Sequence, residues 1–339
     1  MTVGKTDLDS RVRMVRRGKC EMETTARETP AIVLERPGDL TLRTVALTSG
    51  GPDAIHVDVE WSGISTGTER LLWSGRMPPF PGLGYPLVPG YETVGRVTKA
   101  PKGVGLSEGD RVFVPGANCY QDVRGLFGGA AKHLIVPAAR VVKLNEALDD
   151  KGVLLALAAT AYHAVAGEGA QCPDLIIGHG IVGRLIARIT VALGATAPLV
   201  WETNPQRRDG ALGYEVVDPS EDARRDYHAI CDASGAASVL DTLIGRLAKR
   251  GEVTLAGFYE EPLSFTFPPA FMREARIRIA AEWARSDIDA VAELITSGKL
   301  NLDGLVTNHA TPHEAPDAYR TAFTDPSCLK MVLDWREAA

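Results

Sequence analysis

The sequence is poor in closely spaced cysteines. Its five cysteines are scattered along 339 residues, and no two of them have the CxxC spacing. A disulfide framework or a structural zinc site built from thiols needs paired or clustered cysteines. The spacing therefore argues against both, and it is typical of a protein in a reducing compartment such as the cytoplasm.

Basic charge and long apolar runs are scarce as well. The formal net charge is -6, so no overall positive field would attract phosphate backbones. The longest apolar stretch covers residues 153–166 and contains Thr160 and His163. It is shorter than the roughly 20 apolar residues that a membrane-spanning helix needs. The sequence thus predicts neither nucleic-acid binding nor a transmembrane segment.

The length and patterning predict two folded domains. With 45% hydrophobic and 24% charged residues, a chain of 339 residues is typical of about two globular domains. Between residues 30 and 150, short β runs are separated by Gly and Pro, which predicts a mostly antiparallel β domain. After residue 150, apolar strands alternate with helical patterns, as in a doubly wound parallel sheet. Residues 1–29 show neither pattern, and we expect a loose tail there.

A proline-rich stretch interrupts the β domain. Residues 77–89 contain five prolines, which disfavour a helix and most sheet pairing. We expect a rigid loop over this stretch.

A glycine motif follows the first strand of the second domain. Residues 178–183 read Gly-His-Gly-Ile-Val-Gly, directly after a predicted strand over residues 174–177 and at the start of a helical pattern. Gly178 permits a tight turn, Gly180 lets backbone approach a pyrophosphate, and Gly183 allows the helix to pack closely on the strand. The helix N-terminus favours the diphosphate charge. The motif therefore predicts a dinucleotide site.

An acidic residue bears on the choice of dinucleotide. Glu202 ends the next predicted strand, about 20 residues after the glycines, where an acid accepts hydrogen bonds from the adenosine ribose. A carboxylate there repels a 2′-phosphate. Arg207 and Arg208 complicate this choice, although we expect them on the following helix and facing solvent. The prediction favours NAD over NADP.

The order of these parts resembles the medium-chain alcohol dehydrogenase superfamily. Besides the glycine motif, the resemblance rests on Gly-Tyr-Glu-Thr-Val-Gly at residues 90–95, Gly-Asp-Arg-Val at 109–112 and Gly-Gly-Ala-Ala-Lys at 128–132. It covers about residues 30–335. The resemblance implies an α/β fold with a GroES-like, β-rich catalytic domain and a doubly wound Rossmann domain, and an active site in the cleft between them.

The same resemblance implies how the domains divide the chain. It assigns residues 30–150 to the catalytic domain and residues 151–285 to the NAD-binding Rossmann domain. Residues 286–339 are then a return segment that completes the catalytic domain.

The residues that hold catalytic zinc in zinc-dependent members of the superfamily are missing. This sequence has Ser65 in place of the cysteine, Tyr91 in place of the histidine and an alanine within residues 156–160 at the third position. A hydroxyl, a phenol and a methyl group do not compete with water for zinc. We therefore expect no catalytic metal. The alternative is a displaced site with Glu92, His133 or Cys119 as ligands.

One zinc-free branch of the superfamily is especially similar. Residues 62–70 read Ser-Gly-Ile-Ser-Thr-Gly-Thr-Glu-Arg, and residues 73–92 continue the likeness to a branch that acts on bacteriochlorophyllides. The resemblance implies NAD-dependent oxidation of the C3 1-hydroxyethyl group of a bacteriochlorophyllide to acetyl, in bacteriochlorophyll biosynthesis. It also implies a homodimer. Because an apolar pigment passes on to membrane enzymes, we expect transient contact with photosynthetic membranes.

Without zinc, another group must stabilise the developing alkoxide. The phenol of Tyr91 is the candidate, as a hydrogen-bond partner or a proton relay that Ser65 and Thr66 extend to solvent. The alternative is that the Tyr91 ring only fills the space of the metal. For Glu92 we expect a role in orienting backbone or pairing with a buried arginine, with direct catalysis as the alternative.

The remaining candidates would contact cofactor or substrate. Thr160 matches the family threonine beneath the nicotinamide, with helix packing as its alternative. The further predicted cofactor contacts are Ile181, Val182 and Gly257. A macrocycle needs a wide apolar slot, and the predicted lining residues are Trp73, Met77, Phe80 and Tyr85. The alternative is that these side chains are buried within their own domain.

Two other functions stay open at this point. One is a zinc-free, NADPH-dependent quinone or enoyl reductase, against which Glu202 and the loop around Tyr91 argue. The other is a nucleotide-binding or pigment-binding protein without turnover, which the glycine motif alone does not distinguish from an enzyme.

Overall fold

The computed structural model describes residues 27–79 and 81–337 of the chain. Phe80, predicted to line a substrate slot, lies outside the described residues, and so does most of the predicted tail over residues 1–29. Glu28 and Thr29, which that prediction included in the tail, already belong to the first strand. Within the described ranges, no helix combines the length and the apolar character that crossing a bilayer requires.

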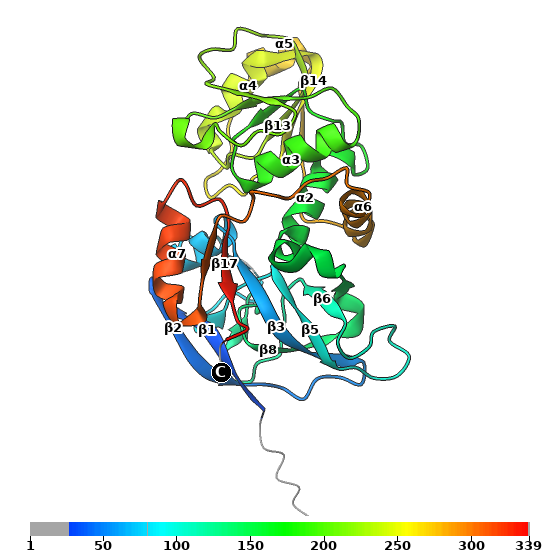
Figure 1. Cartoon of the computed structure of the whole chain (residues 1–339). Coiled ribbons are helices and arrows are strands. Elements are labelled where there is room, and N and C mark those ends of the chain that lie inside the picture. The colour runs from blue at the N-terminus through cyan, green and yellow to red at the C-terminus, as the bar shows by residue number, and fades with distance from the viewer. Residues whose placement is uncertain (1–26, 80, 338–339) are drawn as a thin grey trace, which may run out of the picture.

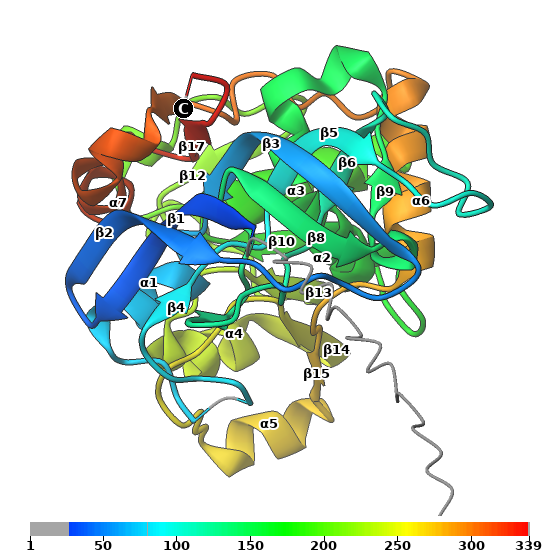
Figure 2. The ribbon, with the colours of Figure 1, turned by 90° about the horizontal axis from the view of Figure 1, so that it is seen from below.

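The chain folds into two lobes, one of β-strands and one with a parallel sheet flanked by helices (Figure 1). The first lobe contains two sheets, seen from below in Figure 2. The smaller one has the order β2-β1-β4-β7. Its strands are β1 (Glu28–Arg36), β2 (Asp39–Ala46), β4 (Leu87–Val88) and β7 (Arg124–Gly125).

The larger sheet of the first lobe has seven strands in the order β16-β17-β3-β5-β6-β9, with β8 paired to β3. Along β3, buried Ile55, Val57 and Val59 alternate with partly exposed residues, the period expected for a strand with one face on the core. The strands are β3 (Ala54–Ile64), β5 (Thr93–Lys99), β6 (Arg111–Val114), β8 (His133–Pro137), β9 (Val142–Lys143), β16 (Asn308–Ala310) and β17 (Met331–Asp334).

The prediction of a loop over residues 77–89 was wrong for Leu87 and Val88. Both are fully buried, and they pair with β1 on one side and β7 on the other. Pro86 and Pro89 flank them, and a proline has no N–H to donate to a ladder. The strand is therefore limited to the two residues between the prolines.

The second lobe has a six-stranded parallel sheet in the order β12-β11-β10-β13-β14-β15. The sequence predicted five of these strands. It missed β12 because only three residues form it and none of them is fully buried. The strands are β10 (Leu175–Ile177), β11 (Leu199–Trp201), β12 (Glu215–Val217), β13 (Tyr227–Asp232), β14 (Leu247–Leu255) and β15 (Arg276–Ile279), and the helices on this sheet include α3 (Ile181–Ala192), α4 (Leu240–Arg246) and α5 (Phe267–Arg273).

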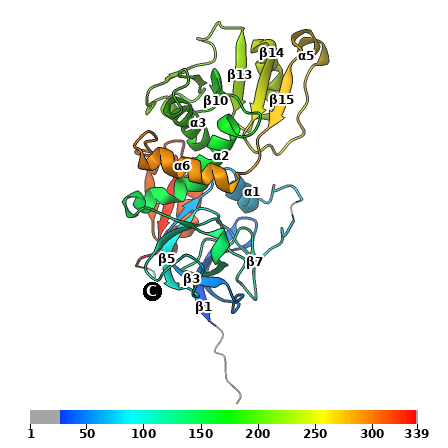
Figure 3. The same ribbon diagram turned by 90° about the vertical axis from the view of Figure 1, so that its right-hand side faces the viewer.

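Helices α2 (Leu155–Ala166) and α6 (Arg285–Thr296) lie side by side at the junction of the lobes (Figure 3). Ile288 and Val291 of α6 are fully buried in a core cluster that also contains the alanine-rich face of α2. Helix α6 falls within the predicted return segment, yet it packs on α2. The predicted domain bounds remain a prediction.

The C-terminal part of the chain returns to the first lobe. Strand β17 pairs antiparallel with β3, from Met331 opposite Ile64 to Asp334 opposite Trp61, and Figure 1 shows red β17 beside blue β3. Helix α7 (Ala315–Thr324) packs against β2 and β17. The remaining short elements are the 3-10 helices η1 (Ala138–Arg140), η2 (Glu146–Leu154), η3 (Pro205–Arg207), η4 (Ala237–Val239) and η5 (Pro312–Glu314).

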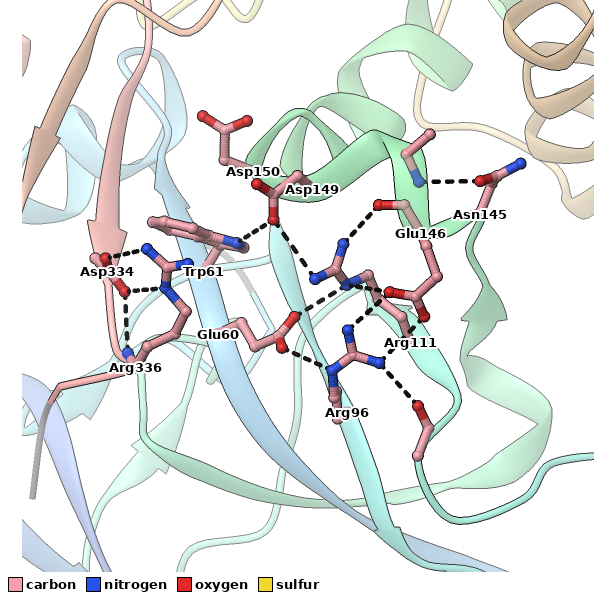
Figure 4. Close-up of polar contacts among 12 residues, drawn as sticks. Glu60, Trp61, Arg96, Arg111, Asn145, Glu146, Asp149, Asp150, Asp334 and Arg336 are labelled. Carbon is pink, nitrogen blue, oxygen red and sulfur yellow. Dashed lines mark hydrogen bonds and ion pairs between the residues drawn. The ribbon is translucent and has the colours of Figure 1, made fainter.

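An ion-pair network joins η2, which precedes α2, to the larger sheet (Figure 4). Glu60 of β3 accepts hydrogen bonds from Arg96 of β5 at 2.8 Å and from Arg111 of β6 at 3.0 Å. Arg96 also binds the Glu146 carboxylate, while Arg111 donates to the Glu146 carbonyl and faces Asp149 at 3.5 Å. Both arginines thus connect the sheet to the segment that leads into the second lobe.

Candidate functional site

The glycine motif forms the turn between β10 and α3. Gly178 has φ of 91°, a left-handed conformation that favours glycine. A Cβ on Gly183 would lie 1.9 Å from the Gly178 carbonyl oxygen, so only glycine lets α3 begin this close to the strand. Around Gly180, by contrast, a Cβ would meet no atom within 4 Å. Gly178 is thus needed for the turn and Gly183 for helix packing, whereas at Gly180 the backbone is open to a ligand.

The N-terminus of α3 suits a diphosphate. Gly180 is the N-cap residue, and no side chain caps the helix. The first N–H groups of a helix have no partner within the helix and carry its positive dipole end. Ile181 is almost fully buried and Val182 is half-buried, so both support the turn from the core side. These residues fit the predicted dinucleotide.

The predicted contact Gly257 lies at the same edge of the sheet. Its N–H donates to the Asp232 carbonyl at 3.0 Å, and a Cβ on it would lie 2.9 Å from the Gly235 nitrogen. A Cβ on Gly178 would in turn meet Ser234 at 3.3 Å. The turns after β10, β13 and β14 therefore meet at the carboxyl ends of the strands, where ligands of such sheets bind.

Glu202 follows β11 and is nearly buried. Its carboxylate accepts the His179 N–H at 2.9 Å and the Asn204 N–H at 2.8 Å. Arg208 donates to the Glu202 carbonyl at 2.9 Å and forms an ion pair with Asp218. The expectation that Arg208 faces solvent was wrong in part, because the side chain is half-buried and held on both sides.

His179, between the first two motif glycines, has a structural role. Its ring nitrogens lie 2.6 Å from the Arg207 carbonyl and 2.8 Å from the Tyr214 hydroxyl. Because a carbonyl only accepts, Nδ1 carries the proton and Nε2 accepts from Tyr214. Burial lowers the pKa of His179 to about 4, so the ring is neutral at physiological pH.

Ser65 and Tyr91 meet where β3 and β5 stop pairing. Ser62 lies opposite Thr93, and the Gly63 N–H donates to the Glu92 carbonyl at 2.8 Å. Continuing this antiparallel register brings the next residues together, and the Tyr91 hydroxyl lies 2.7 Å from Ser65 Oγ. The two residues predicted to stand at zinc-ligand positions of the superfamily thus form a hydroxyl pair.

The environment of Tyr91 keeps its phenol protonated. Burial raises the pKa of Tyr91 well above its ordinary value, and the nearby Glu92 charge raises it further, against a smaller opposing effect of the Ser65 hydroxyl. The ring packs edge-on against Phe127, with 5.2 Å between centroids. Tyr91 can therefore donate a hydrogen bond, whereas a free phenolate is disfavoured. Thr66, the other predicted relay residue, is partly exposed beside Ser65.

Glu92 is fully buried and pairs with a cation. Lys330 Nζ lies 2.6 Å from Glu92 Oε2, and neither side chain has any exposed surface. The expected buried partner is thus present, although it is a lysine rather than an arginine. Burial raises the pKa of Glu92, which Lys330 opposes. Its other oxygen, Oε1, has no hydrogen-bond partner among the described residues.

Glu69 is a site residue that sequence reasoning missed. It lies in the first turn of α1 (Thr68–Ser74) and is only 1% exposed. Its carboxylate accepts the Ser65 N–H at 3.1 Å and the Tyr319 hydroxyl at 2.7 Å. A signal was present: Leu72 is buried, and the i, i+3 spacing puts Glu69 on the same helix face.

Thr160 lies on α2 and is partly buried. Its hydroxyl donates to the Ala156 carbonyl one turn earlier, at 3.0 Å. This bond satisfies the hydroxyl within the helix, which is the packing role considered as the alternative. A nicotinamide contact of Thr160 remains a prediction.

The predicted substrate-lining residues pack mainly within the first lobe. Met77 is 8% exposed in the core, and the Trp73 ring packs on Phe323 of α7, with 5.7 Å between centroids. The Tyr85 hydroxyl donates to the Leu72 carbonyl at 2.6 Å. Trp73 and Tyr85 nevertheless stay partly exposed. The contacts thus favour burial within the domain for Met77 and leave two aromatic residues accessible.

Within residues 27–79 and 81–337, no three His, Cys, Asp or Glu side chains lie close enough together to hold a metal ion. Of the ligands considered for a displaced site, Glu92 is bound to Lys330, His133 faces Asp58 at 3.2 Å and Cys119 is buried.

One core cluster connects the hydroxyl pair to the cofactor turn. It contains Trp61 and Val94 of the larger sheet together with Ile176 and Ile181 of the second lobe. Partly buried Tyr91 and Val182 both pack against it. The predicted catalytic and cofactor residues therefore border the same core where the lobes join.

Comparison with known proteins gives consistent likenesses. Residues 51–146 match the alcohol dehydrogenase GroES-like domain family. The chain is 56% identical to the 2-desacetyl-2-hydroxyethyl bacteriochlorophyllide A dehydrogenase of Rhodobacter capsulatus, over 92% of this chain and 99% of the relative. The protein of the same name from Cereibacter sphaeroides is also 56% identical, with the same coverage.

Solved structures share the fold at lower identity. The (2R,3R)-butanediol dehydrogenase of Bacillus subtilis superposes with a TM-score of 0.79 at 21% identity, over 91% of this chain and 99% of that one. An alcohol dehydrogenase from Escherichia coli CFT073 that binds NADH and a dehydrogenase from Sinorhizobium meliloti that binds NADP superpose with TM-scores of 0.77 and 0.75, each at 21% identity and over 91% of this chain and 99% of that one. The architecture is that of the medium-chain dehydrogenases.

Proposed function

Since this chain belongs to the medium-chain alcohol dehydrogenases, in the family of the 2-desacetyl-2-hydroxyethyl bacteriochlorophyllide A dehydrogenases, we propose that it oxidises the C3 1-hydroxyethyl group of a bacteriochlorophyllide to acetyl with NAD. The chain is an oxidoreductase that acts on a CH–OH group and uses a nicotinamide cofactor. The proposed substrate rests on the high sequence identity to two dehydrogenases of that name over nearly their whole length.

The choice of NAD rests on the groups around Glu202. Its carboxylate stands at the end of β11, where a 2′-phosphate would be repelled. Arg208 is paired with Asp218, and Arg207 donates to the Pro326 carbonyl. The charge of Arg208 is therefore already balanced by a carboxylate. The open backbone at Gly180 and the uncapped N-terminus of α3 would hold the diphosphate.

The chemistry divides between the cofactor and the hydroxyl pair. When bound, NAD would supply the acceptor for the hydride that leaves the alcohol carbon. Tyr91, kept protonated by burial, donates a hydrogen bond to the substrate oxygen and so stabilises the developing alkoxide. The proton released from the alcohol would pass through the Tyr91 phenol to Ser65 Oγ, 2.7 Å away, and on through partly exposed Thr66 to solvent. A serine, a tyrosine and an alanine at the ligand positions support a reaction without zinc.

A spectroscopic assay tests this function. Purified protein is incubated with NAD and hydroxyethyl bacteriochlorophyllide after dialysis against a chelator. We expect NADH to form and the pigment absorption to shift to the red, because the acetyl carbonyl is conjugated with the macrocycle. No shift, together with reduction of a quinone by NADPH, would favour the reductase alternative; binding of both ligands without turnover would favour the non-catalytic one.

The substrate slot remains a proposal for two residues. Trp73 and Tyr85 keep part of their rings exposed, so they can contact the macrocycle, whereas Met77 is buried. We expect Trp73→Ala to raise KM for the pigment about tenfold while the Kd for NAD stays unchanged, as for the loss of one large apolar contact. A KM equal to that of the wild type would remove Trp73 from the slot.

A homodimer is the proposed assembly. Strand β15 is the last strand of the six-stranded sheet, and apolar side chains are exposed on it and on neighbouring α5. Figure 2 shows α5 and β15 on one side of the molecule. The exposed residues are Phe267, Phe271, Met272, Ile277 and Ile279. Light scattering should give twice the chain mass, and Ile279→Lys should give the monomer.

We propose that the protein is cytoplasmic and contacts photosynthetic membranes only transiently. A cytoplasmic protein that touches photosynthetic membranes only briefly would co-sediment weakly with vesicles when pigment is bound. Strong binding of the pigment-free protein to vesicles would contradict this.

A further inference from the structure

Three charged side chains and a tyrosine are buried together behind Ser65. Glu69, Glu92, Tyr319 and Lys330 are each at most 2% exposed. They come from α1, from the residue before β5, from α7 and from the residue before β17. The proposed reaction uses only the hydroxyl pair that lies next to them. It does not explain why these charges are buried.

The cluster holds one peptide group from both ends. The Ile64 carbonyl accepts from Lys330 Nζ at 3.0 Å, and the Ser65 N–H of the same peptide donates to Glu69 Oε1 at 3.1 Å. The peptide that carries Ser65 is therefore fixed between an ammonium and a carboxyl group. Hydrogen bonds to charged groups are stronger than those between neutral groups. These two hydrogen bonds keep Ser65 Oγ within hydrogen-bond distance of the Tyr91 hydroxyl.

The charges of the cluster do not balance when all are ionised. Two carboxylates then face one ammonium, and the excess negative charge is buried. Glu92 has Lys330 as its direct partner, whereas within the described residues the hydrogen bonds to Glu69 come from the Ser65 N–H and the Tyr319 hydroxyl. Burial, with a further contribution from the Glu92 charge, raises the pKa of Glu69 to about 7, against the hydrogen bond from Tyr319. Glu69 is thus the group that gains and loses a proton.

We propose that Glu69 is a positioning residue for the alcohol oxidation, which holds the Ile64–Ser65 peptide and couples the charge of the cluster to the hydroxyl pair. This inference rests on the proposed function. Tyr319 of α7, Glu92, Lys330 and Tyr91 are the titratable and charged groups that face it. Ionised Glu69 adds a negative charge near Tyr91, which disfavours a developing alkoxide at the same place. Neutral Glu69 therefore favours hydride transfer.

Single-turnover kinetics across pH test the coupling. At saturating NAD and pigment, we expect the rate of NADH formation to fall about tenfold as pH rises through the ionisation of Glu69. Glu69→Gln keeps the size and the acceptor oxygen but cannot ionise, so this fall should disappear. Tyr319→Phe removes a hydrogen bond that lowers the pKa of Glu69, so the midpoint should move to higher pH. Asp317→Asn, at an exposed position of α7, is the matched control and should leave the midpoint unchanged.

A second readout does not depend on turnover. In infrared spectra, the carbonyl band of a protonated carboxylic acid should titrate near neutral pH in the wild type and be absent in Glu69→Gln. If that variant does not fold, Tyr319→Phe provides the test instead, because the pH midpoint at which the band titrates should be higher than in the wild type. Circular dichroism and the Kd for NAD report whether each variant is folded.

The outcomes separate this inference from the proposed function. If the band titrates but the pigment is not oxidised, the proposed function fails while the ionisation of Glu69 stands. If the pigment is oxidised and Glu69→Gln keeps the midpoint of the wild type, Glu69 only packs the turn and the inference is overturned. A lower pH midpoint in Tyr319→Phe than in the wild type would overturn the inference as well.

Discussion

The Tyr91 hydroxyl lies 2.7 Å from Ser65 Oγ. Because burial keeps the phenol protonated, it can donate to the substrate oxygen. We expect Tyr91→Phe to lower kcat by about ten- to a hundredfold, the range of a positioned donor. The Kd for NADH, measured by fluorescence, should not change, because the cofactor turn is formed by other residues.

Ser65→Ala is the matched control for this hydroxyl pair. It leaves the phenol in place but removes its partner, so we expect a smaller loss of kcat than for Tyr91→Phe. Unchanged turnover of the phenylalanine variant would show that the ring only fills space, as the alternative reading of the sequence allowed.

The two later glycines of the cofactor turn should respond differently to a methyl group. At Gly180 the methyl meets no protein atom within 4 Å, so Gly180→Ala should fold normally. It should weaken NAD binding about tenfold or more, because the methyl occupies the approach of the pyrophosphate. Thermal unfolding and a titration with NAD measure the two effects separately.

Gly183→Ala is the comparison. Its methyl would lie 1.9 Å from the Gly178 carbonyl oxygen, so α3 must shift. We expect a loss of about 2 kcal/mol or more in the free energy of unfolding, as for strained overpacking. Equal stability of the two variants would contradict the assigned roles of the glycines.

The charge of Glu202 should set the cofactor preference. Glu202→Gln removes the charge that repels a 2′-phosphate, so the ratio of kcat/KM for NAD to that for NADP should fall about tenfold. Asp218→Asn should act in the same direction, because it releases Arg208 from its ion pair. Rates with both cofactors provide the measurement, and an unchanged ratio in both variants would mean that other residues select the cofactor.

The cofactor turn could be predicted from the sequence because its constraints are local. Gly178 needs its positive φ and Gly183 its close approach within one strand–turn–helix unit. The pairing of Ser65 with Tyr91 was accessible only through the family resemblance. It depends on the register of β3 against β5, which the sequence does not define.

The buried cluster could not be predicted in the same way. Glu69, Glu92, Tyr319 and Lys330 are up to 261 positions apart in the chain, and only the return of β17 and α7 to the first lobe brings them together. Charged residues in a sequence are mostly solvated. Glu92 was predicted to orient backbone or to pair with a buried arginine; the buried partner is Lys330, and which cation it is depends on tertiary packing.

The ionisation of Glu69 should make the stability of the protein depend on pH. The pKa of this carboxyl is raised from 4.5 to about 7 in the folded protein, so between these values the folded state binds more protons than the unfolded state. Its contribution to stability is therefore fully present below about pH 4.5 and is lost as pH rises through about 7.

Glu69→Gln cannot ionise and should escape this loss. Relative to the wild type, its free energy of unfolding should be higher at about pH 8 than at about pH 5, by on the order of 2 kcal/mol. Urea unfolding of both proteins at the two pH values measures the difference, and Asp317→Asn, whose side chain is exposed, serves as the control. A difference between variant and wild type that is the same at both pH values would mean that Glu69 keeps an ordinary pKa.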